Sequence, residues 1–162
     1  MKIGVYPGSF DPFTVGHEDV LRHAASLFDK VYVSVSVNPT KNPAFTVEER
    51  VDLIRRVVEA NAMENVIVTS FAGLTVNYAR SVSAGYIIRG LRAIMDFEYE
   101  FQLGAVNRHL AGDIQTVFFM ASPEHSFLSS SAVREAGSMG GSIVGLVPAS
   151  IQNIIAERLA RP

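Results

Sequence analysis

Two residue patterns alternate along the whole chain and constrain its fold more than any other feature of the sequence. Short runs rich in β-branched and aromatic residues predict strands, and the stretches between them have the 3.6-residue apolar period of amphipathic helices. Strands that alternate with helices typically form a parallel sheet with right-handed crossovers. The sequence therefore predicts an α/β fold with about five parallel strands, at residues 2–6, 31–37, 66–71, 86–89 and 116–120.

The helix expected after residue 46 has the clearest start. Thr46 and Glu49 have the spacing of a capping box, and four apolar residues fall on one face of the helix that follows, namely Val47, Val51, Ile54 and Val58. Pro148 suits the first turn of a C-terminal helix. The glycine-rich stretch 138–142 predicts a loop. The other helices are expected near residues 18–28, 74–82, 95–110, 130–138 and 148–160.

The 162 residues fit a single domain, residues 1–162, and leave no room for a second catalytic domain. A net charge of -2 argues against nucleic acid or an anionic membrane as a partner. The chain has no cysteine, which excludes zinc–thiolate sites and thiol nucleophiles. We find no signal-peptide core and no apolar run of about 18 residues, so a cytoplasmic location is expected.

Residues 7–17, PGSFDPFTVGH, join the first expected strand to the first expected helix. Ligands of open parallel sheets bind at the carboxyl ends of the strands, so a site is expected in this turn. Gly8 can adopt backbone angles closed to other residues, and the prolines stiffen the turn. Ser9 and Thr14 supply hydroxyls, and Gly16 lets a base or a phosphate approach a helix N-terminus that favours anions.

His17 falls in the first turn of that helix. A protonated imidazole there would oppose the helix dipole, so we expect the ring to titrate low unless a bound anion compensates. A neutral ring can still donate one hydrogen bond to a phosphate oxygen. The alternative is that His17 only caps or packs the helix.

Two more strand ends carry cationic side chains. Lys41 lies in a proline-bracketed loop after the second strand, where it could bind phosphate as a point charge or could be a solvated lysine. Arg89 and Arg92 lie near one turn after the fourth strand and suggest a site for an oligophosphate. Glu98 or Glu100 could balance these arginines, and the alternative is an arginine–carboxylate network at the surface.

The stretch after the fifth strand carries three consecutive serines, residues 129–131. One of them would cap the next helix, and the others would offer hydroxyls to a second anion, although three serines could also serve only as a cap. The chain has neither a P-loop motif nor a G-x-G-x-x-G after its first strand. Four anion-favouring turns at one edge of the sheet therefore indicate a nucleotide or phosphate site of another type.

Thr14-Val15-Gly16-His17 resembles the [HT]-x-G-H signature of the nucleotidyltransferase superfamily. Four longer stretches resemble, in order and spacing, the bacterial phosphopantetheine adenylyltransferases: YPGSFDPFTVGH, NPTKNPAFTVEER, IIRGLRAIMDFEYEFQLGAVNRHL and SFLSSSAVRE. The resemblance spans essentially the whole chain. It implies a Rossmann-like doubly wound sheet, a homohexamer, and transfer of AMP from ATP to 4'-phosphopantetheine, giving dephospho-coenzyme A and pyrophosphate. It also implies Mg²⁺ bound with ATP, and coenzyme A as a feedback ligand.

The resemblance further implies roles for individual residues. The catalytic residues would be His17, Lys41 and Arg92. The acceptor substrate would meet Ser9, Lys41, Leu74, Thr75, Arg89 and Asn107. ATP would meet Ser9, Phe10, Thr14, Gly16, His17, Gly90, Leu91, Arg92, Glu100, His125, Ser126, Phe127, Leu128, Ser129, Ser130 and Ser131. His125 stands where family members usually carry Tyr or Trp, and we expect it to change the affinity for ATP rather than the chemistry.

The implied chemistry suits these residue types. A phosphate monoester is largely dianionic at neutral pH because its second pKa is about 6, so the acceptor needs no general base. The enzyme would supply alignment and charge stabilisation. Two other functions stay open at this point: transfer of a nucleotidyl group to another phosphate, such as nicotinamide mononucleotide, and a non-catalytic nucleotide-binding module.

Overall fold

The computed structural model describes residues 1–38, 42–92 and 94–160. It confirms the predicted α/β fold, with a parallel five-stranded sheet in the order β3-β2-β1-β4-β5. The strands are β1 (Ile3–Gly8), β2 (Lys30–Val37), β3 (Val66–Ala72), β4 (Tyr86–Leu91) and β5 (Gln115–Met120). The helices are α1 (Val15–Leu27), α2 (Val47–Ala60), α3 (Thr75–Ser81), α4 (Ile94–Leu110), α5 (Ser130–Ser138) and α6 (Gln152–Leu159), with a short 3₁₀ helix at Pro123–His125.

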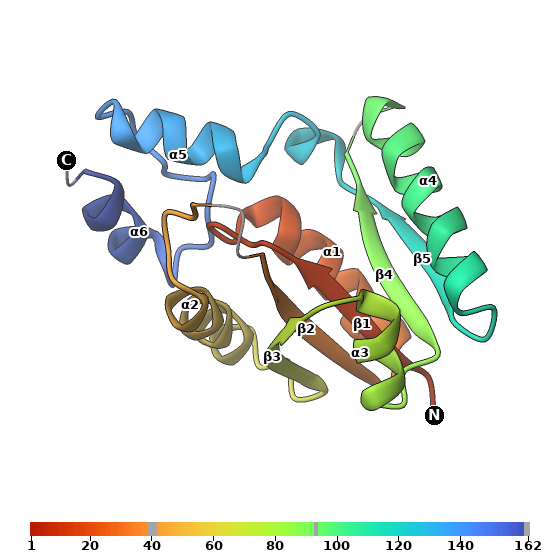
Figure 1. Ribbon diagram of the computed structural model, residues 1–162. Coiled ribbons are helices and arrows are strands. Elements are labelled where there is room, and N and C mark those ends of the chain that lie inside the picture. The colour runs from red at the N-terminus through yellow and green to blue at the C-terminus, as the bar shows by residue number, and fades with distance from the viewer. Residues whose placement is uncertain (39–41, 93, 161–162) are drawn as a thin grey trace.

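Helices cover both faces of the sheet (Figure 1). The larger core packs α1, α2, α5 and α6 together, with Leu21, Ile54 and Ile155 fully buried in it. A smaller core holds α3 against the opposite face through Val76 and Ala79. Figure 1 shows α4 beside β4 and β5, at the edge of the molecule away from α2 and α6. The sheet is therefore doubly wound, as the resemblance implied.

The capping box predicted for α2 is present. Thr46 Oγ1 accepts a hydrogen bond from the backbone N–H of Glu49 at 3.2 Å, and Glu49 Oε2 accepts one from the backbone N–H of Thr46 at 2.7 Å. Both bonds satisfy donors that a helix N-terminus otherwise leaves without partners. The four apolar residues of its predicted face are buried or packed against the larger core.

Two local predictions were wrong. The C-terminal helix begins at Gln152 and not near Pro148, because the stretch before it forms a turn in which Ile151 N donates to Pro148 O at 3.1 Å. Gly8 belongs to β1 and does not use a left-handed backbone angle; Phe10 does, with φ 47°. A Cβ on Gly8 would lie 2.7 Å from Phe10 Cζ, so the close approach of that ring explains the glycine.

Within residues 1–38, 42–92 and 94–160, no helix combines the length and the apolar character that crossing a membrane requires.

The buried face of α2 should dominate its contribution to stability. Ile54 is fully buried, so we expect Ile54→Ala to lower the free energy of unfolding by about 2–5 kcal/mol. Ile67 on the edge strand β3 is 37% exposed, and Ile67→Ala should cost less than about 1 kcal/mol. Urea denaturation of both variants at one protein concentration measures the difference. Equal losses would contradict this assignment of the core.

Candidate active site

The sheet opens between its two central strands. β1 pairs with β2 at six positions but with β4 only at Gly4 and Val5. The helices that follow β1 and β4 lie on opposite faces, so the strand order reverses here, and such a point is where open α/β sheets bind ligands. A cavity of about 570 Å³ lies at the carboxyl end of this opening.

Most of the predicted site residues line this one cavity. They are Ser9, Phe10, Thr14, Gly16, His17, Arg89, Gly90, Arg92, Glu100, Leu128, Ser129, Ser130 and Ser131. Three of the four anion-favouring turns therefore converge. Lys41 lies outside the described residues, but Asn42 and Pro43 of the same loop line the cavity.

The other predicted residues are elsewhere. Leu74 and Thr75 lie at the start of α3 and Asn107 in the last third of α4, and none of them lines the cavity. Leu91, His125, Ser126 and Phe127 do not line it either, although a Cβ on Gly16 would lie 3.8 Å from His125 Cβ. Sequence reasoning missed the other lining residues that carry charge or polar groups, namely Tyr6, Asp11, Ser36, Asn38, Asn42, Arg50 and Arg134.

His17 is part of the N-terminal cap of α1. Thr14 Oγ1 accepts a hydrogen bond from the backbone N–H of His17 at 3.3 Å, and His17 Nδ1 accepts one from the backbone N–H of Thr14 at 3.0 Å. The capping role that the sequence left open is thus real. Since Nδ1 accepts, a neutral ring must carry its proton on Nε2, so the side chain that closes the helix end also brings a hydrogen-bond donor to the cavity.

The surroundings of His17 keep its ring neutral. Its centroid lies 5.1 Å from that of Phe10 and 5.4 Å from that of Phe13. Burial, with the nearby charges of Arg92 and Arg89, lowers the pKa of His17 to about 3. A protonated imidazole would also lose the bond from the amide of Thr14. Without a bound anion, His17 is therefore a neutral ring at neutral pH and offers a hydrogen-bond donor rather than a positive charge.

Arg89 and Glu100 form a bidentate pair at the cavity wall. Arg89 Nε and Nη2 donate to the two carboxylate oxygens of Glu100, each at 2.6 Å, and Nη1 donates to Pro7 O at 3.3 Å. Burial alone would lower the pKa of Arg89, but the hydrogen bonds and charge of Glu100 raise it above its usual value. The guanidinium is thereby held in one orientation between β1 and α4.

Arg92 has a similar arrangement on the other side of Gly90. Its Nε lies 3.0 Å from Asp96 Oδ2, and its Nη1 donates to Leu128 O at 2.7 Å. Both arginines thus have carboxylate partners, which the alternative of an arginine–carboxylate network predicted. Both arginines also line the cavity. The bond to Leu128 O joins the residue just before the three serines to the end of β4, since Arg92 directly follows that strand.

The three serine hydroxyls all have partners inside the protein. Ser129 caps α5 by accepting from Ala132 N at 3.1 Å, and Ser130 Oγ donates to Pro12 O at 2.8 Å. Ser131 Oγ accepts from Arg134 Nη2 at 3.2 Å. The prediction of one capping serine is confirmed. Ser130 donates its proton to Pro12 O, whereas Ser129 and Ser131 only accept in these bonds. The O–H groups of Ser129 and Ser131, the backbone N–H groups at the start of α5 and its dipole are what this helix end offers to an anion.

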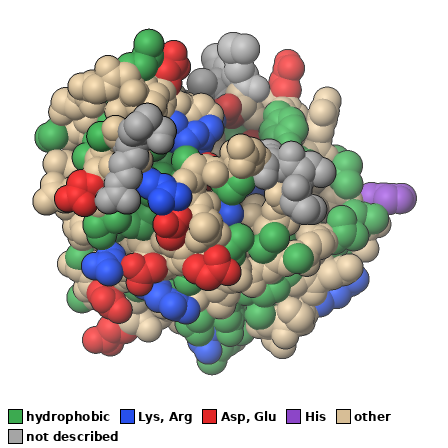
Figure 2. All heavy atoms as spheres, turned by 60° about the vertical axis from the view of Figure 1, so that its left-hand side comes forward, with side chains coloured by type: hydrophobic (Ala, Val, Ile, Leu, Met, Phe, Trp, Pro, Cys, Tyr) green, Lys and Arg blue, Asp and Glu red, His purple; other side chains and the backbone are tan. Residues whose placement is uncertain are grey.

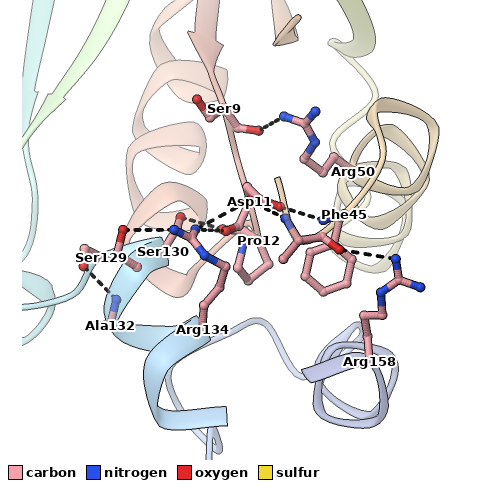
Figure 3. Close-up of polar contacts among 12 residues, drawn as sticks. Ser9, Asp11, Pro12, Phe45, Arg50, Ser129, Ser130, Ala132, Arg134 and Arg158 are labelled. Atoms are coloured by element: carbon pink, nitrogen blue, oxygen red, sulfur yellow. Dashed lines mark hydrogen bonds and ion pairs between the residues drawn. The ribbon is translucent and has the colours of Figure 1, made fainter. Parts of the chain in front are cut away.

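Ser9 contrasts with these serines. Among the described residues its hydroxyl has no hydrogen-bond partner, and Figure 3 shows it pointing away from Arg50. The described residues that line the cavity include four arginines and two carboxylates, with helix N-termini on two sides. This combination is suited to a ligand with several negative charges.

A cytidylyltransferase-like family model matches residues 5–136, which include the whole cavity wall from β1 to α5. Over 158 residues the chain is 50% identical to the phosphopantetheine adenylyltransferase of Moorella thermoacetica, covering 98% of both chains. It is 51% identical to that of Lachnoclostridium phytofermentans, covering 98% of this chain and 96% of the relative. The chain belongs to the phosphopantetheine adenylyltransferase family. The resemblance seen in the sequence is thereby confirmed.

Solved structures support the same fold at much lower identity. A bifunctional NMN adenylyltransferase/ADP ribose pyrophosphatase from Francisella tularensis superposes with a TM-score of 0.75 at 13% identity, over 99% of this chain and 50% of that one. The Plasmodium falciparum nicotinic acid mononucleotide adenylyltransferase gives a TM-score of 0.70 at 14% identity, over 98% and 94%. The Rossmann-like architecture is therefore shared across these nucleotidyltransferases.

The carboxylates of the cavity are already committed to other partners. Asp11 accepts from the backbone N–H groups of Ala44 and Phe45 at 3.0 and 2.9 Å, and Glu100 holds Arg89. In the part of the chain that the structure describes, no group of three or more His, Cys, Asp or Glu side chains could hold a metal ion. A metal at this site would have to find most of its ligands on the substrate or in water.

The partly buried, neutral His17 should make stability depend on pH. Because its folded pKa is about 3 against 6.5 in the unfolded chain, its contribution is complete above pH 6.5 and is lost as the pH falls toward 3. We expect the wild type to lose about 2 kcal/mol more unfolding free energy than His17→Gln between pH 7 and pH 5. Urea denaturation at both pH values measures this, and parallel losses in the two proteins would contradict it.

Proposed function

We propose that the chain transfers AMP from ATP to 4'-phosphopantetheine and releases dephospho-coenzyme A and pyrophosphate, a step of coenzyme A synthesis. The observation that carries this proposal is the 50% identity, over 98% of both chains, to an enzyme named for this activity. The gathering of His17, Arg89 and Arg92 in one cavity supports it. In the reaction, an oxygen of the acceptor phosphate bonds to the α-phosphorus of ATP while the bond to the pyrophosphate leaving group breaks.

His17 would stabilise the transition state of this transfer. Its Nε2–H would donate to an oxygen of the α-phosphate, whose negative charge increases as the new bond forms. A neutral donor suits this role because its position is fixed by the cap of α1 before substrate arrives. The acceptor phosphate needs no base, since it is largely dianionic at neutral pH.

The cationic groups would divide between the two substrates. Arg89, together with Lys41, would hold the phosphate of 4'-phosphopantetheine, and the pantetheine arm would extend toward Leu74, Thr75 and Asn107. ATP would lie along Ser9 and Phe10, with its phosphates between Arg92 and the N-terminus of α5. Residues 125–128 would border its adenosine. Coenzyme A would compete with the substrates for the site as a feedback ligand. The cytoplasmic location of the protein stays a prediction.

Mg²⁺ would enter with ATP. The two carboxylates that line the cavity are engaged by backbone amides and arginine, so the ion would be held by phosphate oxygens and water with few protein ligands. It would neutralise part of the triphosphate charge, and the residues of this chain would orient the phosphates around it.

The proposed activity can be tested directly with purified protein. Mixed with ATP, Mg²⁺ and 4'-phosphopantetheine, the protein should release pyrophosphate, because His17, Arg89 and Arg92 line one cavity that is suited to several phosphates. A coupled pyrophosphate assay with a panel that includes nicotinamide mononucleotide measures the acceptor preference. Release with 4'-phosphopantetheine no higher than background would reject the proposal, and release with another acceptor alone would redirect it.

The variant His17→Ala tests the role of His17 in the same assay. We expect it to keep the fold and much of the substrate affinity but to lower kcat by several orders of magnitude, because it removes a donor used mainly in the transition state. A kcat near that of the wild type would return His17 to a purely capping role.

We further propose that copies of the chain assemble through α4 into a homohexamer. Apolar side chains of α4 are exposed on two sides of the helix: Phe97, Tyr99, Phe101, Val106 and Leu110 are each 46–63% exposed. Monomers rarely leave so many large apolar side chains of one helix uncovered. The face in Figure 2, turned forward from the side of α2 and α6, instead mixes acidic and basic side chains.

A charge on either side of α4 should weaken this assembly. We expect Phe101→Asp and Val106→Asp each to reduce the mass measured by light scattering, since a buried carboxylate without a partner is costly at an interface. Met139→Asp is the control, because Met139 is 80% exposed and lies at the end of α5, away from α4. A monomeric wild type, or α4 variants that stay hexameric, would contradict the proposal.

A further inference from the structure

The loop between β1 and α1 is held from outside by side chains that bind its carbonyl oxygens (Figure 3). Arg50 Nη1 of α2 donates to Ser9 O at 2.7 Å, and Arg134 Nη1 of α5 donates to Asp11 O. Ser130 Oγ donates to Pro12 O at 2.8 Å. Figure 3 shows Arg50 and Arg134 reaching the loop from different sides. These bonds join protein groups to one another, and none of them involves His17, Arg89 or Arg92.

We propose that Arg50 and Arg134 are positioning residues that orient the backbone of residues 9–12 for the phosphates of ATP. The inference rests on the proposed function and adds two side chains to it. Neither arginine was among the residues that the sequence placed in the site, and both line the cavity.

The geometry of the peptide group makes the orientation specific. The carbonyl of Ser9 and the N–H of Phe10 belong to one planar peptide and point in opposite directions. When Arg50 fixes that carbonyl, it also directs the N–H of Phe10 to the side away from Arg50. Phe10 has φ 47°, a conformation that is costly for a non-glycine residue and persists only where its surroundings hold it. Arg50 is one of the groups that hold it.

Arg50 has features of a residue kept for positioning rather than for stability. It is 4% exposed, and among the described residues no carboxylate lies within 4 Å of it. Its Nε donates to Thr46 O at 3.2 Å, so both carbonyls that it binds are neutral, and the charges of Asp11 and Glu48 act on it only from a greater distance. Burial lowers its pKa. Burying a cation in this way contributes little net stability compared with an apolar side chain of the same volume.

Arg134 connects the same loop to α5. Its Nη2 donates to Ser131 Oγ, and its Nη1 lies 3.6 Å from Asp11 Oδ2. The carboxylate of Asp11 is in turn fixed by the amides of Ala44 and Phe45. Arg158 of α6 extends the connection, since its Nη2 donates to Ala44 O at 3.4 Å. The loop and the N-terminus of α5 are thus set relative to one another through Arg134.

Steady-state kinetics can separate positioning from other roles. We expect Arg50→Met and Arg134→Met to raise KM for ATP and lower kcat, each on the order of tenfold, because displaced amides bind the transferring phosphates less well. KM for 4'-phosphopantetheine should change less than about twofold. Arg50→Lys keeps a charged donor and should recover part of the loss. The control is Arg56→Met on the same helix, since Arg56 forms an exposed pair with Asp52 and does not line the cavity.

Amide hydrogen exchange tests the same inference without substrates. In Arg50→Met and Arg134→Met, a peptide covering residues 9–14 should exchange on the order of tenfold faster than in the wild type, with no such change in Arg56→Met. Because this readout needs no activity, it remains decisive even if the wild type releases no pyrophosphate. A wild type that releases no pyrophosphate would reject the proposed reaction but would leave the positioning role of the two arginines to be decided by exchange.

Two outcomes would overturn the inference. One is wild-type exchange in residues 9–14 and wild-type kinetics for ATP in both methionine variants. The other is a loss of kcat that equals the loss of folded protein measured by circular dichroism. If Arg50→Met fails to fold, Arg50→Lys and Arg134→Met test the inference by the same two measurements.

Discussion

The early separation of β1 from β4 is the constraint on which the site depends. The two strands pair only at Gly4 and Val5, and the chain then runs through Pro7, which has no N–H to donate to a neighbouring strand. Arg89 reaches across the opening and donates to Pro7 O. The cavity exists because two central strands of a continuous sheet part before they end, and helices from opposite faces close it on either side.

Several side chains at the cavity bind the rest of the fold with some of their atoms and leave other atoms for the cavity. His17 uses Nδ1 to close the start of α1 and keeps Nε2–H for the cavity. Arg89 uses one edge of its guanidinium for Glu100. Ser129 and Ser131 accept hydrogen bonds from Ala132 N and Arg134 Nη2 with a lone pair, which leaves their O–H groups as donors. Such double use fixes each donor before a ligand binds, and fixed donors lose little entropy on binding.

The sequence predicted what local pattern determines. The alternation of strands and helices, the cap at Thr46 and the position of His17 in the first turn of α1 follow from residue types a few positions apart. Arg50 and Arg134 could not be found in this way, because the carbonyls they bind lie 41 and 123 residues away. The start of α6 was misplaced because Pro148 also suits a turn. Partners chosen by tertiary packing leave no periodic signal.

The hydrogen bonds that Arg50 and Arg134 donate to the loop at residues 9–12 also bear on the order in which the chain folds. Contacts between residues far apart in sequence form after local ones, since closing a long loop costs more entropy. The loop therefore reaches its final shape only when both α2 and α5 have docked, even though it lies next to the N-terminus. Any ligand that requires this shape binds the completed fold alone, and it stabilises the chain from β1 to α5 as one unit.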